Sequence, residues 1–145
     1  MEPLRVEAIV TTIPTRFSMP AWIEVKLTNQ QSAPVLVNKR LGIGYRNSLD
    51  RELFAEVFPR NGDTVVSIEA IDYQRNPSDA TDYVWLQPGE TISTSFDLFD
   101  WYTLPGPGEY DLVVSYQADD SPDRYPQGLL TGIHSSKRVP LDVIP

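Results

Sequence analysis

The sequence contains no cysteine and only one histidine, His134. Without cysteine, the chain can form neither a disulfide framework nor a thiolate metal site. A single histidine also cannot build a zinc site of several histidines. The absence of cysteine fits a reducing compartment, although many exported β-sandwich domains also lack it.

Long apolar runs are missing too. No segment approaches the ~20 consecutive apolar residues that a membrane-spanning helix needs, so we expect no membrane insertion. The N-terminus, MEPLRVEAIV, has neither the basic start nor the apolar stretch of a signal peptide. If Met1 is the native start, these features favour a cytoplasmic protein, and otherwise the compartment is unknown.

Basic residues are scarce in the middle of the chain. Residues 61–123 contain thirteen acidic side chains and one base, Arg75, for a net charge of −12. The flanking segments 1–60 and 124–145 each carry +2, which gives −8 for the whole chain. This acidity argues against a nucleic-acid partner. It indicates either a solvated acidic face or a dipolar surface that docks on a basic protein or on a copy of itself.

Alternation of apolar and polar residues is the main pattern present, and it is typical of half-buried strands. It begins with LRVEAIV at residues 4–10, and no amphipathic helix of three turns is evident. Because 145 residues with 41% hydrophobic content suit one core, we predict a single all-β domain over residues 1–145. Its form would be an antiparallel sandwich of about eight or nine strands. Further strands are predicted in WIEVKLTN, PVLVN, YVWLQPGE, TISTSFDLFDWY, GEYDLVVSY and SKRVPLDVI.

The segment between residues 41 and 71 permits two interpretations. LFAEVF, the Asn61-Gly62 dipeptide and TVVSIEAI together favour a β-hairpin with a tight turn. The alternative is a short helical turn that Ser48 would cap. In LGIGYRN, two glycines lie near basic residues, but glycines that bend an edge strand are favoured over a phosphate cradle.

The stretch DWYTLPGPGEYDLVVSYQADD, residues 100–120, predicts a corner at which the chain crosses between sheets. The longer run LQPGETISTSFDLFDWYTLPGPGEYDLVVSY resembles immunoglobulin-like bacterial and secreted domains. It is similar to the N-terminal sandwich of deuterolysin-like and peptidyl-Lys metalloendopeptidases, and to the bacterial intracellular proteinase inhibitor family. The resemblance covers roughly residues 86–116.

This resemblance implies a single antiparallel immunoglobulin-like β-sandwich with a tyrosine corner. Tyr110 would place its ring in the core and bond its hydroxyl to the upstream backbone, with Pro105 and Gly108 as further structural residues. The chain lacks the zinc-binding HExxH of the metallopeptidases, so it would correspond to the accessory domain alone.

Catalytic chemistry finds little support. His134 and Ser135 are strand neighbours and should point to opposite faces, so they cannot form a hydrolase pair. We expect His134 at the surface or at a strand end, and we expect no enzyme, no cofactor and no metal site. Asp119, Asp120 and Asp123 form the tightest acidic cluster, but their spacing is irregular and no glycine lets the loop turn sharply around a calcium ion, so a solvated acidic loop is favoured.

The three tryptophans are expected in two environments. Trp22 and Trp85 lie beside strands and are predicted to be in the core. Trp101 falls at the corner, where partial exposure would allow ligand contact.

These observations favour a non-catalytic recognition or accessory module that binds a protein partner through loops and a sheet edge. Acidic steering onto a basic surface, with Tyr125 as the anchor, would supply the mechanism. One alternative is a proteinase inhibitor whose exposed loop is stiffened by prolines, and another is a structural subunit that self-associates through edge strands. The candidate partner-binding residues are Asp119, Asp120, Asp123, Arg124, Tyr125 and Trp101.

Overall fold

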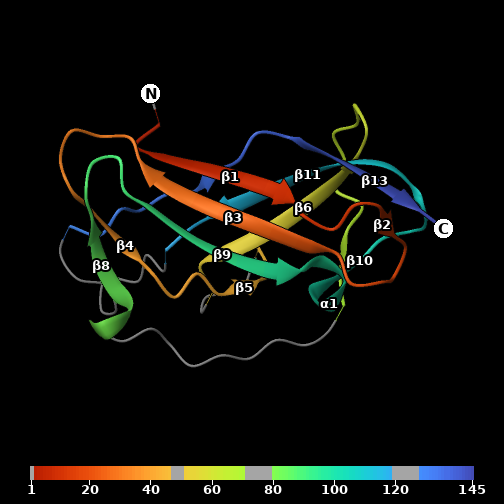
Figure 1. The fold of residues 1–145 in the computed structure, drawn as a ribbon, viewed down its shortest axis with the longest axis horizontal. Coiled ribbons are helices and arrows are strands. Elements are labelled where there is room, and N and C mark those ends of the chain that lie inside the picture. Colours follow the sequence, from red (N-terminus) through yellow and green to blue (C-terminus); the bar gives the residue numbers. More distant parts are fainter. Residues whose placement is uncertain (1, 47–50, 71–79, 119–127) are drawn as a thin grey trace.

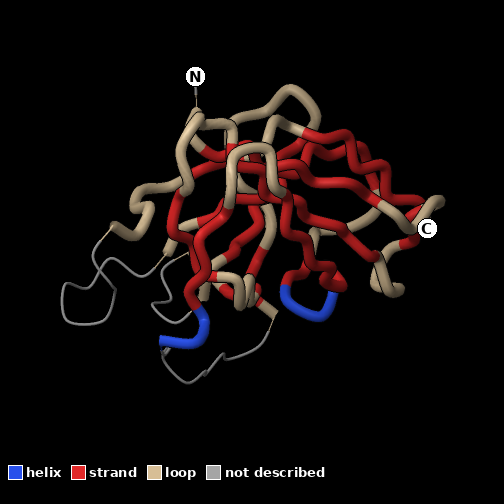
Figure 2. The backbone as a smooth tube through the Cα atoms, turned by 60° about the vertical axis from the view of Figure 1, so that its left-hand side comes forward, coloured by secondary structure: helices blue, strands red, loops and turns tan. Residues whose placement is uncertain are grey.

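Strands dominate the computed structural model of this chain, which describes residues 2–46, 51–70, 80–118 and 128–145. Over these residues it contains thirteen strands, a 3₁₀ turn and one short α-helix (Figures 1 and 2). Eight strands span four residues or more, and the other five are two residues long. No described helix is long and apolar enough to cross a membrane. The longer strands are β1 (Leu4–Val10), β3 (Trp22–Asn29), β4 (Val35–Asn38), β6 (Leu53–Pro59), β8 (Tyr83–Leu86), β9 (Thr91–Asp97), β11 (Gly108–Tyr116) and β13 (Val139–Ile144).

Two sheets contain most of these strands. The first has the order β1-β3-β9, and all its pairs are antiparallel. The second has the order β2-β13-β11-β6-β5, in which β2 (Thr15–Arg16) and β5 (Ile43–Gly44) add parallel pairs at its two edges. β12 (His134–Ser135) also pairs with β11. Two small ribbons, β4-β8 and β10-β7, complete the set, with β7 at Ile68–Glu69 and β10 at Tyr102–Thr103.

Alternating side chains build the core between the two sheets. In β3, Ile23, Val25 and Leu27 are fully buried, whereas the intervening Glu24 and Lys26 are only half-buried. The strand β1 packs across β11 of the other sheet, and Figure 1 shows β1, β3 and β9 lying side by side in front of β11 and β6. Each apolar side chain buried in this way contributes roughly 1.5–3 kcal/mol.

The predicted hairpin after β6 is only partly formed. Asn61 has the positive φ of 61° that the turn requires. The returning chain, however, forms only the two-residue strand β7, which pairs with β10 and not with β6. On the side of β6 away from β11, β5 pairs only with Leu53 and Phe54, and side-chain hydroxyls take the next two N–H groups, Tyr102 that of Ala55 and Ser67 that of Val57. Only isolated backbone bonds remain for the returning chain, such as that from the Val66 N–H to the Val57 carbonyl at 2.8 Å. The alternative helix at Ser48 lies outside the described residues.

The corner between β9 and β11 begins with a helix that the sequence did not predict. The alternation in TISTSFDLFDWY stops at Asp97, and α1 (Leu98–Trp101) replaces the end of the expected strand. Asp97 caps this helix by accepting a hydrogen bond from the Phe99 N–H. Its carboxylate also accepts from the Ala21 N–H at 2.9 Å, which ties the corner to the start of β3.

Tyr110 lies at the other end of the corner. Its ring is buried, and its hydroxyl donates to the Gly106 carbonyl at 2.6 Å, as a tyrosine corner requires. A Cβ at Gly108 would lie 3.5 Å from the Tyr110 ring, which is an ordinary contact, so packing there does not demand glycine. Pro105 is exposed.

Tyr102 makes a second tyrosine link that the sequence did not indicate. Its buried hydroxyl accepts from the Ala55 N–H of β6 at 3.0 Å and donates to the Gly44 carbonyl of β5. Burial raises the pKa of Tyr102, since ionisation would place a charge in the core. The hydroxyl therefore joins the corner to two strands of the second sheet.

We expect Tyr102→Phe to destabilise the fold more than Tyr110→Phe. The first change leaves a buried N–H and a buried carbonyl without partners, and one such group costs about 1–3 kcal/mol. The second removes a single bond from the less deeply buried Gly106 carbonyl. Urea unfolding of the two variants measures the difference, and equal losses would contradict this role for Tyr102.

Candidate functional site

The structure describes only one of the predicted partner-binding residues. Asp119, Asp120, Asp123, Arg124 and Tyr125 all lie outside the described residues, so the acidic patch stays a prediction. Trp101, the remaining candidate, is the last residue of α1.

Trp101 is partly buried. Its ring meets Tyr45 edge to face, with the ring centroids 6.1 Å apart. It also lines a hollow of about 450 Å³ with residues of the 40–43 and 94–96 segments, between the edge strands β9 and β5. Much of its surface is thus engaged in packing within the chain.

The expectation that Trp22 and Trp85 are core residues is wrong. Trp22 is 48% exposed and Trp85 is 51% exposed. The cause is strand parity, because Ile23 and Leu86 take the inward positions and their tryptophan neighbours then point outward.

His134 differs from expectation in a similar way. It does lie on a short strand, β12, but only 7% of its surface is exposed. Its Nε2 is 2.9 Å from the Thr131 carbonyl, and its buried Nδ1 makes no hydrogen bond and lies 3.8 Å from a Glu2 carboxylate oxygen. Ser135 points away and bonds to the Ser115 hydroxyl at 2.8 Å, so the two side chains diverge as predicted. Among the described residues no group of three His, Asp or Glu side chains is placed to hold a metal ion.

The glycines of LGIGYRN lie beside an anion that the chain itself supplies. The Glu52 carboxylate is almost fully buried and accepts two hydrogen bonds from Arg40, at 2.9 and 2.6 Å from its Nε and Nη2. It also accepts from the Gly42 N–H at 2.8 Å. Sequence reasoning missed Glu52, although an acid near two basic residues was the available signal. Gly44 lies in the edge strand β5, whereas Gly42 precedes that strand.

Glu52→Ala should destabilise the fold by about 3–5 kcal/mol, because it leaves the Arg40 guanidinium and the Gly42 N–H without their buried partner. A matched control is Glu56→Ala, which breaks a more exposed pair with Arg46 and should cost less than about 1 kcal/mol. Denaturant unfolding compares the two, and similar losses would show that the buried pair has no special role.

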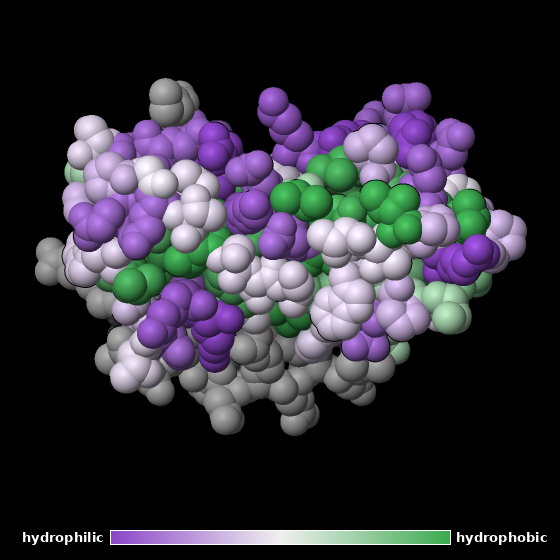
Figure 3. All heavy atoms as spheres, in the orientation of Figure 1, coloured by the Kyte–Doolittle hydropathy of each residue, from purple (hydrophilic) through white to green (hydrophobic). Residues whose placement is uncertain are grey.

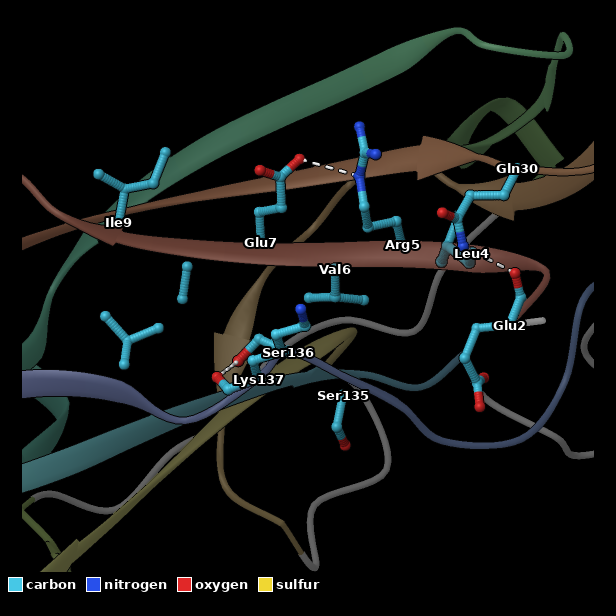
Figure 4. Close-up of a pocket in the computed structure, with 12 residues that line it drawn as sticks. Glu2, Leu4, Arg5, Val6, Glu7, Ile9, Gln30, Ser135, Ser136 and Lys137 are labelled. Carbon is cyan, nitrogen blue, oxygen red and sulfur yellow. Dashed lines mark hydrogen bonds and ion pairs between the residues drawn. The ribbon is translucent and has the colours of Figure 1, made fainter. Parts of the chain in front are cut away.

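A groove of about 540 Å³ follows the outer edge of the first sheet (Figure 4). One wall is β1, which is an edge strand of the sheet β1-β3-β9. The opposite wall consists of residues 135–137 and Val139 of the second sheet. In Figure 4 the Val6 side chain points into the space between the walls, while Arg5 and Glu7 point away from it.

Within the described part of the chain, the backbone of β1 is bonded on one side only. The bonds from the Thr11 N–H to the Trp22 carbonyl and from the Gln30 N–H to the Pro3 carbonyl fix which residues face β3. They are the odd-numbered ones, since hydrogen-bonded pairs alternate along an antiparallel ladder. The N–H and C=O groups of Leu4, Val6 and Ala8 therefore point away from β3 and toward the groove, although these residues are only 2%, 6% and 8% exposed. No other described segment bonds to them.

A β-bulge shapes the opposite wall. Ser135 pairs with Ser115 and Val139 pairs with Leu112, so the second sheet gains one extra residue between these positions. Ser136 fills the irregular stretch by accepting from the Val114 N–H at 3.0 Å and donating to the Lys137 carbonyl at 2.9 Å. These bonds direct the wall toward β11 and leave the β1 edge open.

Charged side chains lie on the solvent side of β1. Arg5 and Glu7 are about half exposed and form an ion pair at 3.1 Å, which Figure 4 shows as a dashed line. The space-filling view in Figure 3 shows apolar residues reaching the surface in a band between hydrophilic ones on this face. An open row of backbone groups beside a groove is the geometry that accepts an added strand.

Comparison with known proteins does not extend this description. No protein-family model matches the chain, and no curated protein matches it. The resemblance to immunoglobulin-like domains therefore stays a prediction.

Proposed function

We propose that this chain is an immunoglobulin-like β-sandwich that serves as a non-catalytic recognition or accessory module. Its protein partner would add an extended segment to β1. The strand order supports the fold, because β1 joins one sheet while the following strand, β2, joins the other in parallel with β13. The corner bond of Tyr110 also supports it.

The open edge of β1 is the observation that carries the proposal. Leu4, Val6 and Ala8 direct their N–H and C=O groups toward a groove, and no bond from the described residues reaches these groups. Main-chain bonds to such an edge give affinity, and alternate side chains of the added segment give specificity.

Ala8→Pro tests this proposal directly. The Ala8 N–H faces the open edge, so proline removes no bond to β3 but blocks an incoming strand. Ser93→Pro is the matched control. The N–H of Ser93 points away from β3, and β9 is the opposite edge strand of the same sheet, so proline removes no bond to β3 there either. Affinity capture from lysate of the source cell should retain one protein with the wild-type chain and with Ser93→Pro. At least tenfold less should be retained with Ala8→Pro.

Thermal unfolding of both proline variants shows whether each bait is folded. Equal retention of the same protein by the wild-type chain and a folded Ala8→Pro variant would overturn recognition at the β1 edge. Loss with both proline variants would assign the interaction to another feature of the first sheet.

A further inference from the structure

The outward-facing charges of β1 are arranged so that the strand complements itself. Arg5 and Glu7 are two positions apart, lie on the same face and are about half exposed. Between them, Val6 presents its N–H and C=O to the open edge. We propose that the strand added to β1 is β1 of a second copy of this chain, antiparallel to the first and with Val6 opposite Val6. This inference rests on the proposed function and names the partner of the same site.

The register follows from the backbone and the charges together. Only even-numbered residues of β1 can exchange hydrogen bonds across the open edge, so Val6 pairs with Val6 and Leu4 pairs with Ala8 of the second copy. Arg5 then lies directly opposite Glu7 of the second copy, and Glu7 lies opposite its Arg5. These are non-hydrogen-bonded pairs, in which side chains approach most closely.

Neighbouring registers lack this complementarity. A shift that centres the pair on Glu7 sets the two Glu7 carboxylates against each other, and a shift that centres it on Arg5 sets the two guanidinium groups against each other. Like charges directly opposite one another are destabilising in a sheet. A shift by one residue would place odd-numbered residues opposite even-numbered ones. The N–H and C=O groups of the odd-numbered residues already bond to β3, so they could not bond to the second copy.

A groove separates β1 from the wall formed by residues 135–137. Because Leu4, Val6 and Ala8 are only 2%, 6% and 8% exposed, the incoming strand has to enter this groove and displace part of that wall. Natural proteins usually protect long edge strands with proline, charged side chains such as lysine, bulges or a covering segment. The two charges of β1, Arg5 and Glu7, are of opposite sign and therefore do not repel a second copy in this register. The stretch 4–10 has no proline and no lysine, and no bulge interrupts its register with β3. Ile9, which is 37% exposed, would lie opposite Pro3 of the second copy. Pairing would then bury apolar surface of Ile9 that is now in contact with water.

Charge-reversed variants test the register. Sedimentation of the full chain at about 0.15 M salt, which screens the repulsion between two copies of net charge −8, should show a reversible dimer over a range of concentrations. Arg5→Glu and Glu7→Arg should each weaken dimerisation by about tenfold or more, because both cross-strand pairs become repulsive. An equimolar mixture of these two variants should form the heterodimer, since one β1 is then acidic and the other basic. The double variant Arg5→Glu/Glu7→Arg should dimerise like the wild-type chain.

Each contrary result has a distinct meaning. A chain that stays monomeric, while its capture of another protein remains sensitive to Ala8→Pro, overturns self-pairing and leaves the proposed function standing. A dimer that Ala8→Pro does not weaken overturns self-pairing through β1, and the capture experiment then decides the proposed function separately. A dimer that Ala8→Pro weakens, but whose strength does not follow the charge reversals, overturns the Val6-centred register.

Discussion

Strand parity is the constraint on which this structure depends. Residues of one strand that share a side-chain face also send their backbone groups in the same lateral direction. In β1, the side chains of Leu4, Val6 and Ala8 enter the core, so their backbone groups must all face away from β3. The residues that hold β1 in the core are therefore the same residues whose backbone groups have no partner strand among the described residues.

The same rule explains how the interior is closed elsewhere. β11 has partner strands on both sides, with β6 on one side and β13 and β12 on the other. Its N–H and C=O groups therefore have hydrogen-bonding partners in both lateral directions. Where strands end, side chains take over this task. The Tyr102 hydroxyl bonds to Ala55 and Gly44, and the Glu52 carboxylate bonds to Gly42 and Arg40. The structure thus satisfies its buried backbone by strands in the middle and by polar side chains at the margins.

Sequence patterns predicted the strands better than their surroundings. Alternation placed β1 at 4–10 and β3 at 22–29, because period two depends only on neighbouring residues. The hydrophobic character of Trp22 led to the wrong prediction that it lies in the core. Adjacent residues of a strand point to opposite faces, so an inward Ile23 already implies an outward Trp22. The partner of β7 and the buried pair of Glu52 with Arg40 depend on contacts between distant segments, which no local pattern encodes. The open edge could not be foreseen either, because it requires the strand order of the whole sheet.

Amide hydrogen exchange of the full chain at two protein concentrations is the most direct test of the claim that the β1 edge is a binding surface. In dilute solution the N–H groups of Val6 and Ala8 should exchange much faster than those of Glu7 and Ile9, which bond to β3. At high concentration Val6 and Ala8 should become protected while the other two change little. If Val6 and Ala8 exchange equally fast at every concentration at which the chain associates, the interface lies elsewhere and the account is wrong.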